Sequence, residues 1–128
     1  MLPVDHSGAR ALVGYRSTMS QGEGGECTLS VEPRHLNRMG VLHGGFVSML
    51  LDNSCGVAVR NALGNPDAAL VTATLTVNFI AGARGGRVTA TGHVTGGGHS
   101  LKFAEAKLHD QDGRLLATAI ATFKIIRK

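Results

Sequence analysis

The alternation of apolar and polar residues along the chain predicts two short strands, then one long helix, then four more strands. The helix is predicted over residues 44–63, where helix formers dominate and the chain is apolar on most sides. A Gly-Asn-Pro sequence at residues 64–66 ends it. The predicted strands cover residues 11–19, 27–31, 71–80, 87–94, 101–109 and 115–126. In the third strand, alternation predicts a polar face made of Thr72, Thr74, Thr76 and Asn78, opposite the apolar residues.

Turns between the last four strands predict consecutive hairpins and therefore an antiparallel sheet. Asp112-Gly113 is a strong signal, because Asp-Gly between alternating runs is typical of a hairpin. The predicted helix is about 30 Å long, enough to cross a curled sheet. We therefore expect an α+β fold in which a single central helix is wrapped by a curved antiparallel sheet; a ferredoxin-like alternative would need a second helix. Residues 1–128 are expected to form one domain, with residues 1–8 as a loose start.

Composition narrows the classes of function. An apolar fraction of 43% with 17% charged residues indicates a globular protein. The net charge of +4 is modest, and the basic residues form no run longer than two, so we expect no nucleic-acid partner. No apolar run approaches the roughly 20 residues that span a bilayer. The cysteines and histidines lack metal-ligand spacing, so we predict no metal and, without a recognisable secretory leader, reduced thiols in a cytoplasmic protein.

The sequence His43-Gly44-Gly45 stands at the start of the predicted helix. Glycines are poor helix formers, but they let a ligand approach the bare backbone. The first amides of a helix have no intrahelical partner and lie at its positive end, so they can stabilise a carbonyl oxygen that gains negative charge. The alternative is that these glycines only allow close packing of the helix start.

Asp52 lies in an apolar part of the same helix, where a carboxylate is costly unless it is paired or functional. It is either an ion-pair or solvent-facing residue, or a nucleophile or general base with a raised pKa. Gly44 and Asp52 are eight residues apart, which is about 12 Å along a helix. One reacting carbonyl needs both groups within about 3.5 Å. If both act on one substrate, the spacing predicts a site between antiparallel helices of a symmetric dimer.

At these residues the chain resembles hotdog-fold thioesterases of the PaaI type. The resemblance runs from about residue 30 to residue 125. Its motif is Asn37…Gly40-x-x-His43-Gly44-Gly45…Asp52, supported by the strand at 71–79 and the hairpin at 112–114. The resemblance implies hydrolysis of an acyl- or aryl-CoA thioester without a cofactor, since CoA is part of the substrate. It also implies a homodimer at minimum and usually a homotetramer.

The resemblance also implies roles for individual residues. The Gly44 N–H would polarise the thioester carbonyl, and Asp52 of the partner subunit would be the nucleophile or the general base for water. Asn37 and His43 would orient the thioester and its loop. Thr72 falls where related enzymes carry a hydroxyl near the attacking water, although threonine is also ordinary on a strand face.

CoA would lie along the subunit interface, and backbone amides in a glycine turn can bind its phosphates. The same turn could equally be a plain hairpin turn. Arg60 and Arg84 are weaker candidates for phosphate contacts. The candidates in the turn and beside it are Gly97, Gly98, His99, Ser100 and Lys102.

Two other functions fit the same architecture. One is a non-catalytic module that binds acyl-CoA, which Asp52 disfavours because a charge beside a thioester adds cost without a catalytic role. The other is a hotdog dehydratase or hydratase, which would place its histidine and carboxylate differently. Cys55 lies near Asp52 but has no paired base, and no GxSxG elbow is present.

Overall fold

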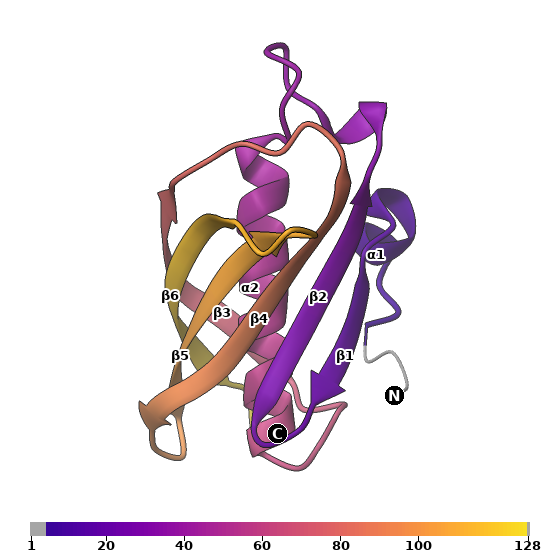
Figure 1. Cartoon of the computed structure of the whole chain (residues 1–128). Helices are drawn as coiled ribbons and strands as arrows, with labels where there is room; N and C mark the ends of the chain where they lie inside the picture. Colours follow the sequence, from indigo (N-terminus) through magenta and orange to yellow (C-terminus); the bar gives the residue numbers. More distant parts are fainter. Residues whose placement is uncertain (1–4, 128) are drawn as a thin grey trace.

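The computed structural model describes residues 5–127 and shows six antiparallel strands curved around one long helix (Figure 1). The strands follow the order β1-β2-β4-β5-β6-β3 in a single sheet. A short helix α1 (Gly8–Val13) precedes them, and a 3-10 turn (Pro33–His35) precedes the long helix α2 (Gly44–Ala62). The strands are β1 (Arg16–Ser20), β2 (Gly24–Val31), β3 (Leu70–Phe79), β4 (Gly86–Gly97), β5 (Leu101–Asp110) and β6 (Leu115–Ile125). The predicted α+β architecture is confirmed.

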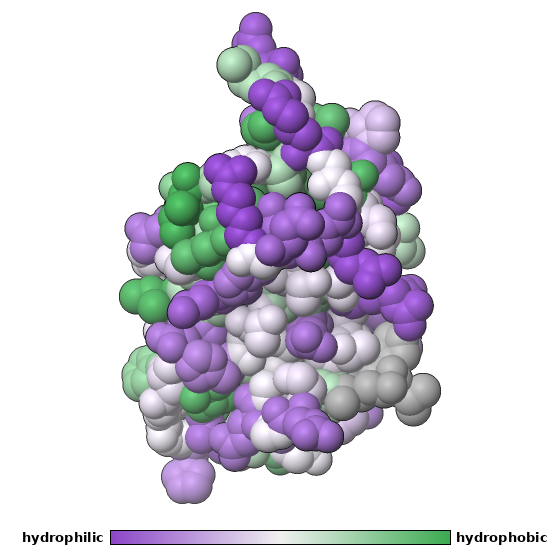
Figure 2. All heavy atoms as spheres, viewed as in Figure 1, coloured by the Kyte–Doolittle hydropathy of each residue, from purple (hydrophilic) through white to green (hydrophobic). Residues whose placement is uncertain are grey.

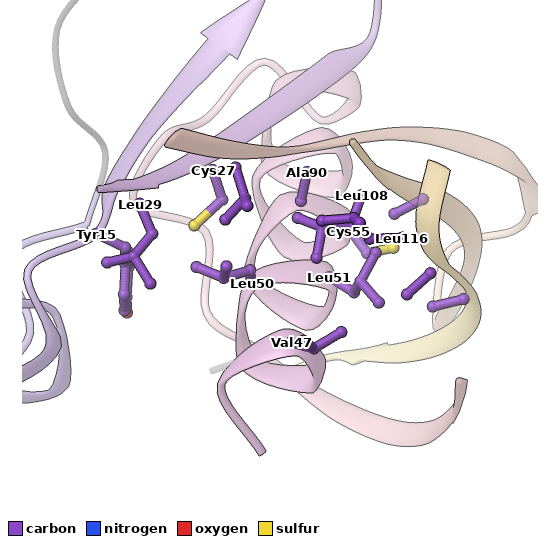
Figure 3. Packing of buried hydrophobic residues seen from close by; sticks show 14 of the residues in the cluster. Tyr15, Cys27, Leu29, Val47, Leu50, Leu51, Cys55, Ala90, Leu108 and Leu116 are labelled. Atoms are coloured by element: carbon purple, nitrogen blue, oxygen red, sulfur yellow. The ribbon is translucent and has the colours of Figure 1, made fainter. Parts of the chain in front are cut away.

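The core lies between α2 and the concave face of the sheet (Figure 3). Leu50 and Leu51 of α2 have no exposed surface, and a fully buried leucine contributes about 1.5–3 kcal/mol to stability. The helix is apolar on several sides because strands surround it, and the sheet supplies the complementary side chains. Residues from five elements meet here, among them Cys27 of β2, Cys55 of α2, Val88 of β4, Leu108 of β5 and Leu116 of β6.

Two glycines bring the sheet close to the middle of α2. Gly25 of β2 and Gly92 of β4 pair with each other in the sheet, and both face Ser54. A Cβ at Gly25 would lie 2.5 Å from the Ser54 carbonyl oxygen, and one at Gly92 would lie 2.8 Å from it. Since real Cβ atoms do not approach so closely, only glycine fits at either position. This contact fixes the helix just after Asp52.

Strand β3 forms one edge of the sheet. It pairs with β6, and its other edge has no strand partner among residues 5–127. The register with β6 shifts between Thr72 and Thr74, which marks a β-bulge. Leu75 packs on the core, and Thr72 contacts α2. The two therefore lie on the same face although they are three positions apart, an odd number that would place them on opposite faces of a regular strand. The predicted polar face is therefore wrong at Thr72, because an extra residue in a strand reverses the alternation.

The beginning of the chain differs from the prediction. Residues 11–13 belong to α1, so the first strand begins at Arg16 rather than residue 11. Ser7 caps α1 by accepting a hydrogen bond from the Arg10 N–H (3.1 Å), and Gly14 ends it in the left-handed conformation (φ 91°). Within the expected loose start over residues 1–8, Asp5 and Ser7 form hydrogen bonds with each other, with Arg10 and with Tyr15. Residues 1–4 lie outside the described residues. No helix within 5–127 is long and apolar enough to cross a membrane.

Candidate active site

Asp52 projects from α2 toward the edge strand β3, where Thr72 meets it. The Thr72 hydroxyl donates a 2.7 Å hydrogen bond to Asp52 Oδ1. Both residues line a cavity of about 440 Å³, which Gly56 and Arg60 also border one and two helical turns further along α2. The structure therefore brings together two of the predicted site residues that lie 20 positions apart.

The electrostatic state of Asp52 follows from its half-buried position. Burial penalises the charged carboxylate and raises its pKa, and the hydrogen bond from Thr72 offsets only part of that rise. No Lys, Arg or His within residues 5–127 forms an ion pair with Asp52. Within these residues, the structure therefore does not support the alternative that Asp52 serves as a structural ion-pair partner. A half-buried carboxyl with a raised pKa beside a cavity has the properties of a general base or nucleophile.

The start of α2 leaves one backbone donor free. His43 is the N-cap, and its Nδ1 accepts a 2.8 Å hydrogen bond from the Gly45 N–H. The carbonyl of His43 accepts from Phe46 and Val47. The Gly44 N–H has no acceptor among residues 5–127. Gly44, rather than Gly45, therefore offers a free donor at the positive end of the helix.

Gly44 and Asn37 line a second cavity, of about 350 Å³. Asn37 Oδ1 accepts hydrogen bonds from the N–H groups of Met39 (2.9 Å) and Val41 (3.2 Å), so it shapes the loop before α2, which projects from the molecule (Figure 1). Phe79 closes the other side, since a Cβ at Gly44 would lie 3.3 Å from its Cε1. Figure 2 shows apolar atoms exposed at this end of β3, where Phe79 is 61% exposed.

The two cavities share no lining residue. One contains Asp52 and Thr72, and the other contains Asn37 and Gly44, with His43 directly before it. Within one chain, the predicted site residues are therefore divided between two separate cavities. The eight-residue spacing of Gly44 and Asp52 on the helix predicts this separation. Within residues 5–127, neither of these two cavities brings the Asp52 carboxylate to the free Gly44 amide.

The predicted phosphate turn has a local structural explanation. Gly97 has φ 121°, and a Cβ there would lie 2.4 Å from the Leu101 carbonyl oxygen, so the hairpin requires glycine. The Gly98 N–H donates to that same oxygen (2.9 Å) and is not free for a phosphate. The turn and Lys102 line neither cavity described above.

The two weaker phosphate candidates lie in different places. Arg60 borders the Asp52 cavity, and its Nε donates a 3.0 Å hydrogen bond to the Ala68 carbonyl. Arg84 donates to the Met39 carbonyl at 3.4 Å, beside the loop that Asn37 shapes. These positions place Arg60, and not Arg84, beside Asp52.

Cysteine chemistry is disfavoured by burial. Cys27 and Cys55 are free and fully buried, and burial raises the pKa of each thiol to about 12. A thiol with such a pKa supplies almost no thiolate near neutral pH. Among residues 5–127 no group of three or more His, Cys, Asp or Glu side chains could hold a metal ion.

Sequence reasoning missed four residues that shape these cavities: Asp5, Asn53, Gly56 and Phe79. Gly56 carried a usable signal, because glycine inside a helix is unfavourable and needs a reason. Asn53 follows Asp52 directly, and its two neighbours in space come from the N-terminal part of the chain. Their contacts are long-range and cannot be read from local patterns.

The fold is that of hotdog proteins. A family model described as Thioesterase superfamily matches residues 39–117, and the chain belongs to that superfamily. It is 30% identical over 94 residues to acyl-coenzyme A thioesterase 13 of Mus musculus, a match that covers 71% of this chain and 65% of that protein. The chain thus spans less than two thirds of the length of the curated relatives it matches, 63% and 65% for two of them.

Solved structures agree. A thioesterase family protein from Silicibacter pomeroyi superposes with a TM-score of 0.85 at 30% identity, covering 95% of this chain and 91% of the other. The PaaI protein of E. coli, from the phenylacetic acid degradation operon, superposes with a TM-score of 0.85 at 20% identity, over 95% and 86% of the two chains. The second likeness shows the shared fold, and the predicted resemblance to PaaI-type hotdog proteins is confirmed.

Proposed function

We propose that the protein hydrolyses an acyl- or aryl-CoA thioester to the free acid and CoA, without a metal or cofactor. The observation that carries this proposal is the state of Asp52: it is half-buried, has no ion-pair partner among residues 5–127, and is hydrogen-bonded to Thr72 beside a cavity. Membership of the thioesterase superfamily supports the reaction class.

In the proposed reaction, Asp52 removes a proton from water as the water oxygen adds to the thioester carbonyl. Alternatively, Asp52 attacks that carbonyl itself and forms an acyl-enzyme anhydride, which water hydrolyses to the free acid after CoA has left. The Gly44 N–H stabilises the negative charge on the carbonyl oxygen. The carbon–sulfur bond then breaks, and CoA leaves as a thiolate that takes up a proton. Thr72 holds one carboxylate oxygen of Asp52, which leaves the other for the reaction.

We propose that two chains complete the site by pairing their β3 edges. The free backbone groups along β3 can pair with the same edge of a second copy. Antiparallel pairing about a two-fold axis between Leu75 and Thr76 would place Thr72 opposite Phe79 of the partner subunit. Because Thr72 holds Asp52 and Phe79 lies against Gly44, this register would bring Asp52 to Gly44 of the partner subunit. Two equivalent sites would result.

The remaining parts of the proposal concern assembly and the rest of the substrate. We propose a homodimer at minimum, with a tetramer as a dimer of dimers, in the cytoplasm. His43 and Asn37 would orient the loop and thioester from the second cavity. Lys102 and the free groups of His99 and Ser100 would contact the CoA phosphates.

The experiment is thiol release from a panel of acyl- and aryl-CoA thioesters by the wild type and Asp52→Ala. We expect turnover to fall by about 10²–10⁴-fold in the variant, the range for loss of a general base, while CoA binding and the thermal midpoint change little. Binding without thiol release by the wild type would instead favour the acyl-CoA-binding module. Hydration of an enoyl-CoA would favour the hydratase. Full activity of Asp52→Ala would contradict the proposed role of Asp52.

A further inference from the structure

The N-terminal residues Asp5, His6 and Ser7 form part of the wall of the Asp52 cavity. They lie more than 40 positions from Asp52 in the sequence, so a specific contact must hold them there. The carboxylate of Asp5 makes that contact. It accepts hydrogen bonds from the Tyr15 hydroxyl (2.6 Å), the Asn53 side-chain amide (2.9 Å) and the Ser7 N–H (2.8 Å).

The partners of Asp5 are themselves firmly placed. Tyr15 is 3% exposed, and Ser17, which has no exposed surface, donates to Asn53 Oδ1. Asn53 therefore uses both ends of its amide to join the N-terminal segment and β1 to α2, one residue after Asp52. Burial alone would raise the pKa of Asp5, but the hydrogen bonds from Tyr15, Ser7 and Asn53 lower it below its usual value. Hydrogen bonds to an ionised carboxylate are the stronger kind.

The cavity has Asp52 and Thr72 among its lining residues and the N-terminal segment as another part of its wall. Gly56 supplies no side chain there; a Cβ would lie 3.5 Å from both Arg60 Nη1 and Phe123 Cε1. Polar groups of His6, Asn53 and Arg60 line it, with Phe123 as an apolar floor. The volume of about 440 Å³ lies within the range of small-molecule sites. Because hydrogen bonds fix the N-terminal segment in the cavity wall, an acyl group that extends past Asp52 toward that segment has limited room, which favours a compact group, such as a ring, over an extended alkyl chain.

We propose that residues Asp5–Ser7, anchored through Asp5 to Tyr15 and Asn53, are a specificity element that closes the acyl end of the site and restricts the substrate to compact acyl or aryl groups. This inference rests on the proposed thioesterase function. Asp5 acts as a positioning residue, because its carboxylate anchors the segment to which it belongs and takes no part in the reaction.

The test compares kcat/KM for phenylacetyl-CoA and decanoyl-CoA in the wild type, Asp5→Ala and Tyr15→Phe. Releasing the segment should raise the decanoyl-to-phenylacetyl ratio by about tenfold or more in Asp5→Ala, the scale of pocket-based discrimination. Tyr15→Phe keeps the buried ring and loses only the hydroxyl, so it should shift the ratio in the same direction. The matched control is Leu12→Ala, a 74% exposed residue of α1, which should leave the ratio unchanged.

The dissociation constants of hydrolysis-resistant thioether analogues of both substrates provide a second readout that does not need turnover. Thiol release by the wild type with an unchanged ratio in both anchor variants would overturn the specificity role alone. An absence of thiol release from every acyl-CoA by the wild type would instead contradict the proposed function. If Asp5→Ala does not fold, Tyr15→Phe decides the question by its ratio and its analogue affinities.

Discussion

Thr72 reaches Asp52 because a β-bulge turns its side chain toward the helix. The 2.7 Å hydrogen bond joins an edge strand to the middle of α2, and the register of β3 with β6 shifts directly after Thr72. Without the shift, Thr72 would share a face with Thr74 and point away from the helix. Bulges commonly re-aim a side chain at a functional site. This one sets the environment of the carboxylate on which the proposed reaction depends.

The first prediction concerns the acid limb of the pH profile. Burial raises the pKa of Asp52, and the Thr72 hydrogen bond lowers it in part. Because the reaction needs the ionised carboxylate, the wild-type kcat/KM should fall with acid at a pH above about 3.9, the ordinary Asp value. Thr72→Val removes the offsetting hydrogen bond and should move this limb to higher pH. Thr74→Val, on the opposite face, is the control; a limb that moves down in Thr72→Val would contradict the assignment.

The second prediction concerns stability. A folded-state pKa of Asp52 above its unfolded value means that the folded protein disfavours the ionised form. The cost of that charge is absent below the unfolded pKa and grows as pH rises through the folded pKa. Asp52→Asn, which still accepts the Thr72 hydrogen bond, should therefore melt at a temperature equal to or above the wild type at pH 7. Calorimetry from pH 3 to pH 7 should show the difference shrinking toward acid; a less stable variant at pH 7 would argue against a burial cost.

Periodicity predicted the central part of the fold well. The helix expected over residues 44–63 is α2 (Gly44–Ala62), because a long apolar run bounded by glycine and Gly-Asn-Pro leaves few alternatives. The start of the chain was predicted poorly. The apolar residues at 11–13 were interpreted as a strand, but the Ser7 cap and Gly14 make them the end of a helix. The secondary structure of these residues is determined by helix capping and not by the hydrophobic pattern.

From the sequence, we could predict only those site residues whose local sequence context is unusual. Asp52 and Gly44 can be recognised from the sequence because a carboxylate in an apolar helix and a glycine pair at its start are both unusual. Asp5 and Asn53 were not visible, since their importance comes from contacts across 48 positions. The face of Thr72 was wrong because a bulge changes strand parity without a sequence signal. Long-range contacts and single-residue insertions therefore limit the prediction.

The third prediction tests the contact that places Asp52 in space. A Cβ at Gly92 would lie 2.8 Å from the Ser54 carbonyl carbon and oxygen, which are backbone atoms and cannot rotate away. Gly92→Ala should therefore displace α2 and destabilise the protein by about 1–3 kcal/mol, the usual cost of overpacking. Gly85→Ala is a suitable control, because nothing lies within 4 Å of its Cβ position and its φ is ordinary. Urea denaturation of the two variants should separate them, and equal stability would mean that the helix has room to move.

The fourth prediction distinguishes the effect of losing the Gly44 N–H from the effect of adding a Cβ at Gly44. Gly44 is the first residue of α2, where proline is well tolerated, and His43 has ψ 135°, as a residue before proline requires. Gly44→Pro deletes the N–H, and Gly44→Ala keeps it with the same Cβ contact to Phe79. Loss of one oxyanion donor should lower kcat by about 10²–10³-fold in Gly44→Pro. Gly44→Ala should retain most of the activity; equal losses in both would assign the effect to crowding.

Mixing two inactive variants then tests whether the site lies between chains. Co-expression of Gly44→Pro with Asp52→Ala gives mixed dimers in which one site has an intact Gly44 from one chain and an intact Asp52 from the other. With random pairing, half of the dimers are mixed and half of their sites are intact, so thiol release should recover to about a quarter of the wild-type rate. A site built within one chain would show no recovery, because every chain carries one of the two lesions. The same mixture made from Asp52→Ala and Asp52→Asn should stay inactive, which controls for effects of assembly alone.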